Sequence, residues 1–184
     1  MLHNLKTAGN LSDEEFELLT SSLHPKKLAK GEHFLEIGHV NSSLGFIEQG
    51  LAMYYRIVRD EIIPVDFATE GNWVSYLKSF NDQVPADLGI KVLEDTTLHC
   101  ISFSSLTTLL EKHPKFHALK THYVERSMMD MAQHSADLAT LDARERYYKF
   151  MHDKPSLINR VPQYYIAAYL GIKPQSLSRI RSSN

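Results

Sequence analysis

The sequence predicts an α+β fold in which an N-terminal antiparallel β jelly roll or barrel is followed by one long helix and a small helical unit. Three observations support this prediction. Between Lys27 and Ser102, short runs rich in β-branched and aromatic residues alternate with glycines. After Pro114 neither glycine nor proline interrupts a helical pattern until about Leu141. Residues 142–184 contain two short helical stretches joined at a glycine.

The composition is that of a globular protein with its own hydrophobic core. The chain has 184 residues, of which 43% are hydrophobic and 23% are charged, so disorder is excluded for most of it. Its single cysteine, Cys100, cannot form an internal disulfide, which fits a reducing compartment. No stretch approaches the roughly 20 apolar residues that span a bilayer. We therefore expect a cytoplasmic protein without a membrane segment.

The N-terminal half begins with a helix and continues as strands. Ser12 is the expected N-cap of a helix through Leu19, and Glu15 completes a capping box. Short, closely spaced strands then favour a sandwich or barrel over a parallel sheet. The expected strands are His33 to Glu36, Leu44 to Glu48, Leu51 to Val58, Ile62 to Ala68, Ile90 to Leu93 and Thr97 to Ser102.

Two helices follow, of which the second is the longer. The first is expected at Ser105 to Lys112, since His113 precedes a proline. The second carries an apolar seam at alternating steps of four and three residues, the spacing of a coiled coil. Such a seam can pack on the β domain or pair with a second copy of the chain, and we favour the second copy. The interface residues are then Val124, Met128, Met131 and Leu138.

Residues 161–180 have the layout of a helix-turn-helix. In the first helix, Gln163 to Leu170, the small Ala167 permits a close approach of the second. Gly171 supplies the positive φ that the turn needs. Pro174 suits the first position of the second helix, where a missing N–H is harmless.

The second helix has one apolar face, formed by Leu177 and Ile180, and one polar face that suits DNA. Arginine can read guanine, glutamine can read adenine, and serine can reach bases or phosphates. We expect base contacts from Gln175, Ser176 and Arg179. Phosphate contacts are expected from five further polar residues, namely Arg144, Arg146, Lys173, Ser178 and Arg181.

The charge distribution agrees with a polyanionic partner at the C-terminal end. Residues 142–184 carry eight Lys and Arg against three Asp and Glu, whereas the rest of the chain has a net charge of −7. The alternative interpretation is an ordinary solvated helical hairpin. The coincidence of the basic segment with the helix-turn-helix pattern favours DNA binding.

The order of these elements resembles that of Crp/Fnr-type transcription regulators over nearly the whole chain. Local matches cover a first strand and turn, a central hairpin, a late strand and the start of the DNA-binding domain. They lie at residues 30–35 with Gly38, residues 46–50 with 54–56, residues 92–96 and residues 143–146. The resemblance implies a cyclic-nucleotide-binding-like β domain, a dimerisation helix and a DNA-binding domain.

The resemblance also implies an effector site, the family's phosphate-binding cassette. Its Gly-Glu pair falls on Ser75 and Tyr76 here, its arginine region falls on residues 85–87, and no arginine lies between Arg59 and Arg126. We therefore expect no response to cyclic AMP. The corresponding pocket is assigned to Trp73, Ser75, Tyr76, Ala86 and Asp87. It is either lined by apolar and aromatic groups or filled by its own side chains, and we favour the filled form.

No metal site, cofactor site or catalytic site is predicted. The ten histidines include pairs such as His113 and His117, but no pair has a third ligand at a compact spacing. One cysteine cannot hold an iron–sulfur cluster. No Gly-rich phosphate loop, nucleophile elbow or Cys/His couple is present. We therefore do not expect an enzyme.

The leading hypothesis is a homodimeric, sequence-specific DNA-binding transcription regulator. Its parts are a β domain at residues 1–113, the long helix at 114–141 and the helix-turn-helix domain at 142–184. Expected partners are double-stranded DNA, a second copy, a small-molecule effector of unknown identity and RNA polymerase, with no membrane. The alternative is a cupin-like, ligand-binding or enzymatic β-barrel protein whose helical tail serves only for assembly.

Overall fold

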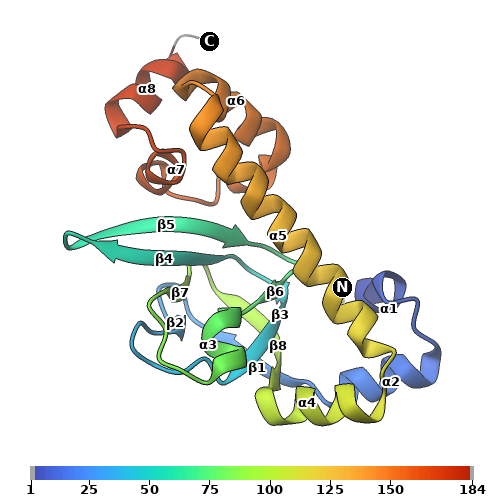
Figure 1. Ribbon diagram of the computed structural model, residues 1–184. Coiled ribbons are helices and arrows are strands. Elements are labelled where there is room, and N and C mark those ends of the chain that lie inside the picture. Colours follow the sequence, from blue (N-terminus) through green and yellow to red (C-terminus); the bar gives the residue numbers. More distant parts are fainter. Residues whose placement is uncertain (1–2, 183–184) are drawn as a thin grey trace.

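The computed structural model describes residues 3–182 (Figure 1). The N-terminal part contains α1 (His3–Ala8), α2 (Asp13–Ser21), β1 (His24–Leu28), β2 (His33–Leu35), β3 (Ser43–Gln49), β4 (Ala52–Val58), β5 (Glu61–Ala68), β6 (Trp73–Val74), α3 (Leu77–Asp82), β7 (Gly89–Val92) and β8 (Thr96–Ser102). The helical part contains α4 (Phe103–Lys112), α5 (Phe116–Thr140), α6 (Ala143–Asp153), the 3-10 helix η1 (Pro155–Leu157), α7 (Gln163–Tyr169) and α8 (Pro174–Ser182).

The strands of the described residues form two antiparallel four-stranded sheets, in the orders β1-β8-β3-β6 and β2-β7-β4-β5. The sheets pack face to face because both contribute apolar side chains to one buried cluster. Ile47 and Leu98 of the first sheet and Ile90 and Val92 of the second are fully buried in it. The predicted antiparallel β domain is confirmed.

Two strands escaped the sequence prediction. The strand β1 reads His-Pro-Lys-Lys-Leu, without a β-branched residue, and it pairs only with β8 at the edge of its sheet. An edge position tolerates Pro25, whose missing N–H would break a central ladder. The strand β6 has only two residues. Both form because neighbouring strands supply hydrogen-bond partners, which a local pattern does not reveal.

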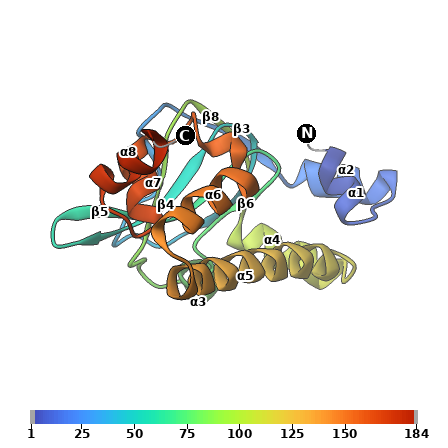
Figure 2. The same cartoon turned by 90° about the horizontal axis from the view of Figure 1, so that it is seen from above.

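The long helix α5 is anchored at its N-terminal end and exposed along most of its length. Phe116 and Leu119 are buried in a cluster with residues of α1, α2, α4 and the first sheet. Beyond Val124 most of its side chains are exposed. Figures 1 and 2 show α5 running past the β domain toward the C-terminal helices. The predicted long helix is confirmed. The division of the chain into segments at residues 113 and 142 stays a prediction. The two ends of the predicted domains, residues 1–2 and 183–184, lie outside the described residues.

The C-terminal helices pack on the second sheet, with α7 lying over the β4–β5 hairpin (Figure 1). A single buried cluster contains Met53 and Phe67 of that hairpin together with Phe150, Tyr165 and Tyr169 of the helical part. The Phe67 and Tyr169 rings meet edge to face with centroids 5.2 Å apart. The sequence did not predict this docking. Each of the two contacting faces is one of several apolar faces in the sequence, and the pattern does not indicate which of them pair.

Arg160 fastens the two parts together through a forked set of hydrogen bonds. Its guanidinium donates two bonds to Glu70, at 2.7 and 3.0 Å, and two to Glu94. It also donates to the Gly50 carbonyl at 3.1 Å. Gly50 has a φ of 119°, and a Cβ there would lie 2.2 Å from the Thr96 hydroxyl oxygen, so only glycine fits this corner.

The fork also perturbs the ionisation of Glu70. Burial acts to raise the pKa of this carboxyl, but the hydrogen bonds from Arg160 and the Gly50 amide outweigh it and hold the pKa below its ordinary value. A carboxyl with a lowered folded-state pKa contributes stability above its ordinary pKa. That contribution is lost as the pH falls through the lowered value.

Replacing Arg160 by Met should destabilise the protein, because two partly buried carboxylates lose the guanidinium that donates to both of them. The expected loss of unfolding free energy at pH 7 is about 2 kcal/mol. The difference from the wild type should shrink as the pH falls from about 4.5, the ordinary pKa of the carboxyl, toward the lowered pKa of Glu70. Urea unfolding followed by circular dichroism measures both effects.

The matched control is Arg144→Met, because Arg144 is exposed and its removal should change stability by less than about 0.5 kcal/mol. An Arg160→Met protein with the wild-type urea midpoint at pH 7 would show that the fork does not hold the docked arrangement.

Candidate nucleic-acid interface

The helix-turn-helix forms as the sequence predicts. Gly171 has a φ of 65°, and the Ile172 amide donates to the Ala167 carbonyl at 2.9 Å to close the turn. Ala167 is fully buried at the contact between the two helices, and Leu177 fixes the inner face of α8. The polar face of α8 therefore points away from the rest of the protein.

The residues expected to contact bases lie on that outer face. Gln175, Ser176 and Arg179 are all exposed. Successive positions on one helix face can enter a major groove together, because a single helix fills its width. The arrangement presents two side chains that can make bidentate contacts with bases and one hydroxyl that can bond to either a base or a phosphate.

Four of the five residues expected to contact phosphates are exposed around this face, namely Arg144, Lys173, Ser178 and Arg181. Arg146 is placed differently. One of its guanidinium nitrogens donates to the carbonyls of Leu141, at 2.6 Å, and of Leu138, at 3.4 Å. These acceptors belong to the C-terminal end of α5, so in this structure Arg146 holds the junction between α5 and α6 and its group is not presented to solvent with the others.

Behind the motif, aromatic and charged contacts hold α7 in place. The His134 ring of α5 stacks on Tyr169 with centroids 4.0 Å apart. Burial lowers the pKa of His134, and the nearby Lys154 charge lowers it further, which favours the neutral form of the ring. Lys154 in turn lies 3.3 Å from the Asp66 carboxylate of β5. The sequence reasoning assigned no role to these residues, because they act only through the packed structure.

The expected dimer seam lies mostly on the exposed part of α5. Met128, Met131 and Leu138 are 64%, 61% and 41% exposed. Val124 differs, since it is partly buried and lines a cavity against the β domain. Met129, which the seam pattern omitted, is 68% exposed beside Met128. The helix thus carries a run of apolar side chains that the rest of the described chain does not cover.

In the expected effector pocket, Tyr76 and Asp87 contact each other, and Arg56 of β4 contacts Asp87. The Tyr76 hydroxyl donates to the Asp87 carboxylate at 2.7 Å, and the Arg56 guanidinium lies 3.1 Å from its other oxygen. The hydrogen bond from Tyr76, aided by the Arg56 charge, lowers the pKa of Asp87. Ala86 is buried beside this group. The cassette thus satisfies its own polar groups.

Arg56 is the residue of this region that the sequence reasoning missed. It comes from β4, about thirty residues before Asp87, so the absence of arginine between Arg59 and Arg126 did not reveal it. The order of the strands could have indicated this contact. The cassette lies between β5 and β7 in the sequence, and both strands pair with β4 in the sheet.

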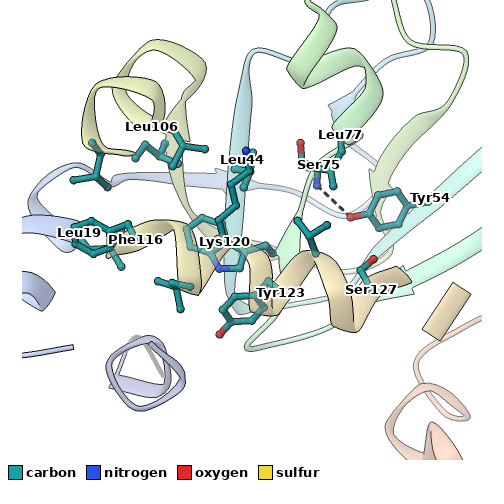
Figure 3. Close-up of a pocket in the computed structure, with 15 residues that line it drawn as sticks. Leu19, Leu44, Tyr54, Ser75, Leu77, Leu106, Phe116, Lys120, Tyr123 and Ser127 are labelled. Atoms are coloured by element: carbon teal, nitrogen blue, oxygen red, sulfur yellow. Dashed lines mark hydrogen bonds between the residues drawn. The ribbon is translucent and has the colours of Figure 1, made fainter. Parts of the chain in front are cut away.

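Two further residues of the expected pocket, Trp73 and Ser75, line an apolar cavity of about 110 Å³ between the β domain and helices α4 and α5. Figure 3 shows this cavity. The Ser75 amide there donates to the Tyr54 hydroxyl at 3.2 Å. Burial raises the pKa of Tyr54. An open groove of about 690 Å³ adjoins this cavity, between β5, α5 and α6, and Trp73, Ser75 and Tyr76 all line it.

Within residues 3–182, no three His, Cys, Asp or Glu side chains gather as a metal site would require. Nor does any helix of that range combine the length and apolar character needed to cross a membrane.

No protein-family model matches the sequence. No curated protein matches it either. Solved structures do match its fold. The c-di-GMP-responsive global regulator CLP of Xanthomonas campestris is 16% identical, with a TM-score of 0.73 over 91% of this chain and 88% of its own. FixK2 from Bradyrhizobium japonicum is 16% identical, with a TM-score of 0.74 over 88% and 83%.

The catabolite activator protein of Thermus thermophilus is also similar, with 17% identity and a TM-score of 0.61 over 97% of this chain and 85% of its own. Identities this low establish the architecture alone. The fold of this chain, with its paired antiparallel sheets, long helix and C-terminal helix-turn-helix, is that of Crp/Fnr-type regulators.

Proposed function

We propose that the protein is a homodimeric, sequence-specific DNA-binding transcription regulator of Crp/Fnr type that works independently of cyclic AMP. The observation that carries the proposal is the outward polar face of α8, which belongs to a helix-turn-helix on a basic segment. Such a helix reads base edges while flanking cations attract phosphates. The fold shared with known regulators supports the same assignment.

The alternative, a cupin-like barrel whose tail serves only for assembly, has less support. A metal-loaded barrel would need inward His and Glu side chains in a cluster, and the described residues hold none. A tail used only for assembly would also have no reason to present Gln175 and Arg179 on a basic, exposed face.

The primary test measures fluorescence anisotropy of labelled duplex DNA, first of random sequence and then of a site selected from a random library. We expect affinity for random DNA that falls steeply with salt and tighter binding to the selected site. The absence of binding to any duplex at low salt would contradict the proposal.

Arg179→Ala should relax the preference for one sequence. Loss of a bidentate base contact costs about 1 to 3 kcal/mol per site, so discrimination between the selected site and random DNA should fall. Arg181→Ala is the matched control, because a lost phosphate contact weakens binding to all sequences and lowers the salt slope by about one. An Arg179→Ala protein with unchanged discrimination would remove Arg179 from base reading.

Exchange of Met128 and Met131 together for Glu should dissociate the dimer. Two recognition helices must reach major grooves about 34 Å apart, which requires a paired chain. The carboxylates would place uncompensated charges in the seam. Sedimentation should show a monomer, while Gln133→Lys, on the opposite face of α5, should remain dimeric. An intact Met128→Glu/Met131→Glu dimer would locate the interface elsewhere.

Cyclic AMP should not bind with useful affinity. A cyclic phosphate that enters the cassette loses hydration and needs charged donors in return, but Arg56 is already paired with Asp87. Calorimetry at millimolar cyclic AMP should show no saturable heat. Asp87→Ala frees Arg56 and should permit weak binding. Wild-type binding tighter than about 10 μM, near −7 kcal/mol, would contradict the cassette interpretation.

A further inference from the structure

The apolar cavity beside α5 is built from segments that lie far apart in the sequence. Its walls come from α2, from strands β3, β4, β6 and β8, from the segment after β6, and from α4 and α5. They consist mostly of leucines and aromatic rings (Figure 3). Leu44, Leu106, Leu109 and Phe116 form much of this lining. At about 110 Å³, it is slightly smaller than an apolar cavity of about 150 Å³ that admits benzene. Its size therefore suits an apolar group of about four to six carbon atoms.

One charged side chain lies against this apolar lining. Figure 3 shows the Lys120 stem extending from α5 along the cavity. Lys120 is partly buried, and within residues 3–182 its ammonium group has neither a hydrogen bond nor an ion pair. A lysine head group has three donors and no acceptor. An unpaired cation that is partly removed from water favours an anionic partner.

Two of the other polar groups that line the cavity, those of Tyr54 and Ser75, are already hydrogen-bonded. The Tyr54 hydroxyl accepts the Ser75 amide, and the Ser75 hydroxyl pairs with the Asn41 side chain at 2.6 Å. The cavity is thus unlike the cassette, where Tyr76, Asp87 and Arg56 bind one another. A single ammonium matches a monovalent carboxylate, whereas a phosphate dianion needs several donors.

From this combination we propose that the cavity binds a short-chain carboxylate, with its alkyl chain among the leucines and its carboxylate on Lys120. The apolar lining supplies the favourable burial of the chain. The unpaired ammonium supplies orientation, which is the usual division of labour in a small-molecule site. The binding site does not depend on DNA recognition, so the two proposals fail independently.

The chain carries its own reporter for this site. Trp73 is the only tryptophan in the sequence and lines the cavity, so its fluorescence follows occupancy in the unlabelled full-length protein. The probe is hexanoate, compared with hexan-1-ol and hexylamine, and calorimetry provides a second readout. We expect saturable binding of hexanoate, about tenfold weaker binding of hexanol and no binding of hexylamine.

Two variants distinguish the contribution of the Lys120 charge to binding from that of the apolar cavity. Lys120→Met keeps the apolar stem and should weaken hexanoate binding about tenfold while hexanol binding stays unchanged. Lys112→Met, an exposed lysine of α4, is the matched control and should bind as the wild type does. Leu106→Phe should fill the cavity and abolish binding of both ligands, with near-ultraviolet circular dichroism to verify folding.

The proposal is overturned by either of two results. One is the absence of saturable hexanoate binding at millimolar concentration by both fluorescence and calorimetry. The other is a Lys120→Met protein that binds hexanoate as tightly as the wild type does. Since no DNA is present, neither result bears on the proposed regulatory function.

Discussion

The docking of the helical C-terminal part on the β4–β5 hairpin is the interaction on which the rest of this structure depends. It combines an apolar cluster, centred on Phe67 and Tyr169, with the Arg160 fork. The cluster supplies burial, which is non-directional, whereas the fork fixes orientation because a guanidinium bonds to carboxylates only in its own plane. Together they decide that α7 faces inward and that the polar side of α8 faces outward. The accessibility of the candidate DNA-reading residues is therefore a consequence of a contact that none of them makes.

The same docking explains why α5 is anchored at both ends and exposed between them. Its N-terminal end is buried against α2 and α4, and its C-terminal end is held through Arg146 and the His134–Tyr169 stack. Between these anchors the helix crosses from one part to the other with little to cover it. Exposed methionines are adaptable apolar side chains, and contiguous apolar surface of this kind favours association. In the proposed homodimer, the same helix of a second copy would cover this surface.

In the β domain, two neighbouring sites have opposite characters. In the cassette, the polar and charged side chains pair with one another, because Asp87 accepts a hydrogen bond from Tyr76 and forms an ion pair with Arg56. The adjacent cavity is open space lined by apolar side chains, with Lys120 as its unpaired charge. The contrast arises because the cassette residues lie on the surface within reach of β4, while the cavity lies where α4 and α5 meet the sheet without filling the space between them.

The sequence by itself determined the elements whose signals are local: the Ser12 capping box, most strands, the long α5 helix and the turn at Gly171 that sets the helix-turn-helix. It also determined which residues of α8 are apolar and which are polar, because a 3.6-residue period needs no partner to be read. Only the tertiary structure decided the rest. Arg160 meets Glu94 and Glu70 across 66 and 90 residues, and Arg56 reaches Asp87 from another strand. Such pairings depend on how whole elements pack, and the residues next to a polar side chain in the sequence do not indicate which distant group it will contact.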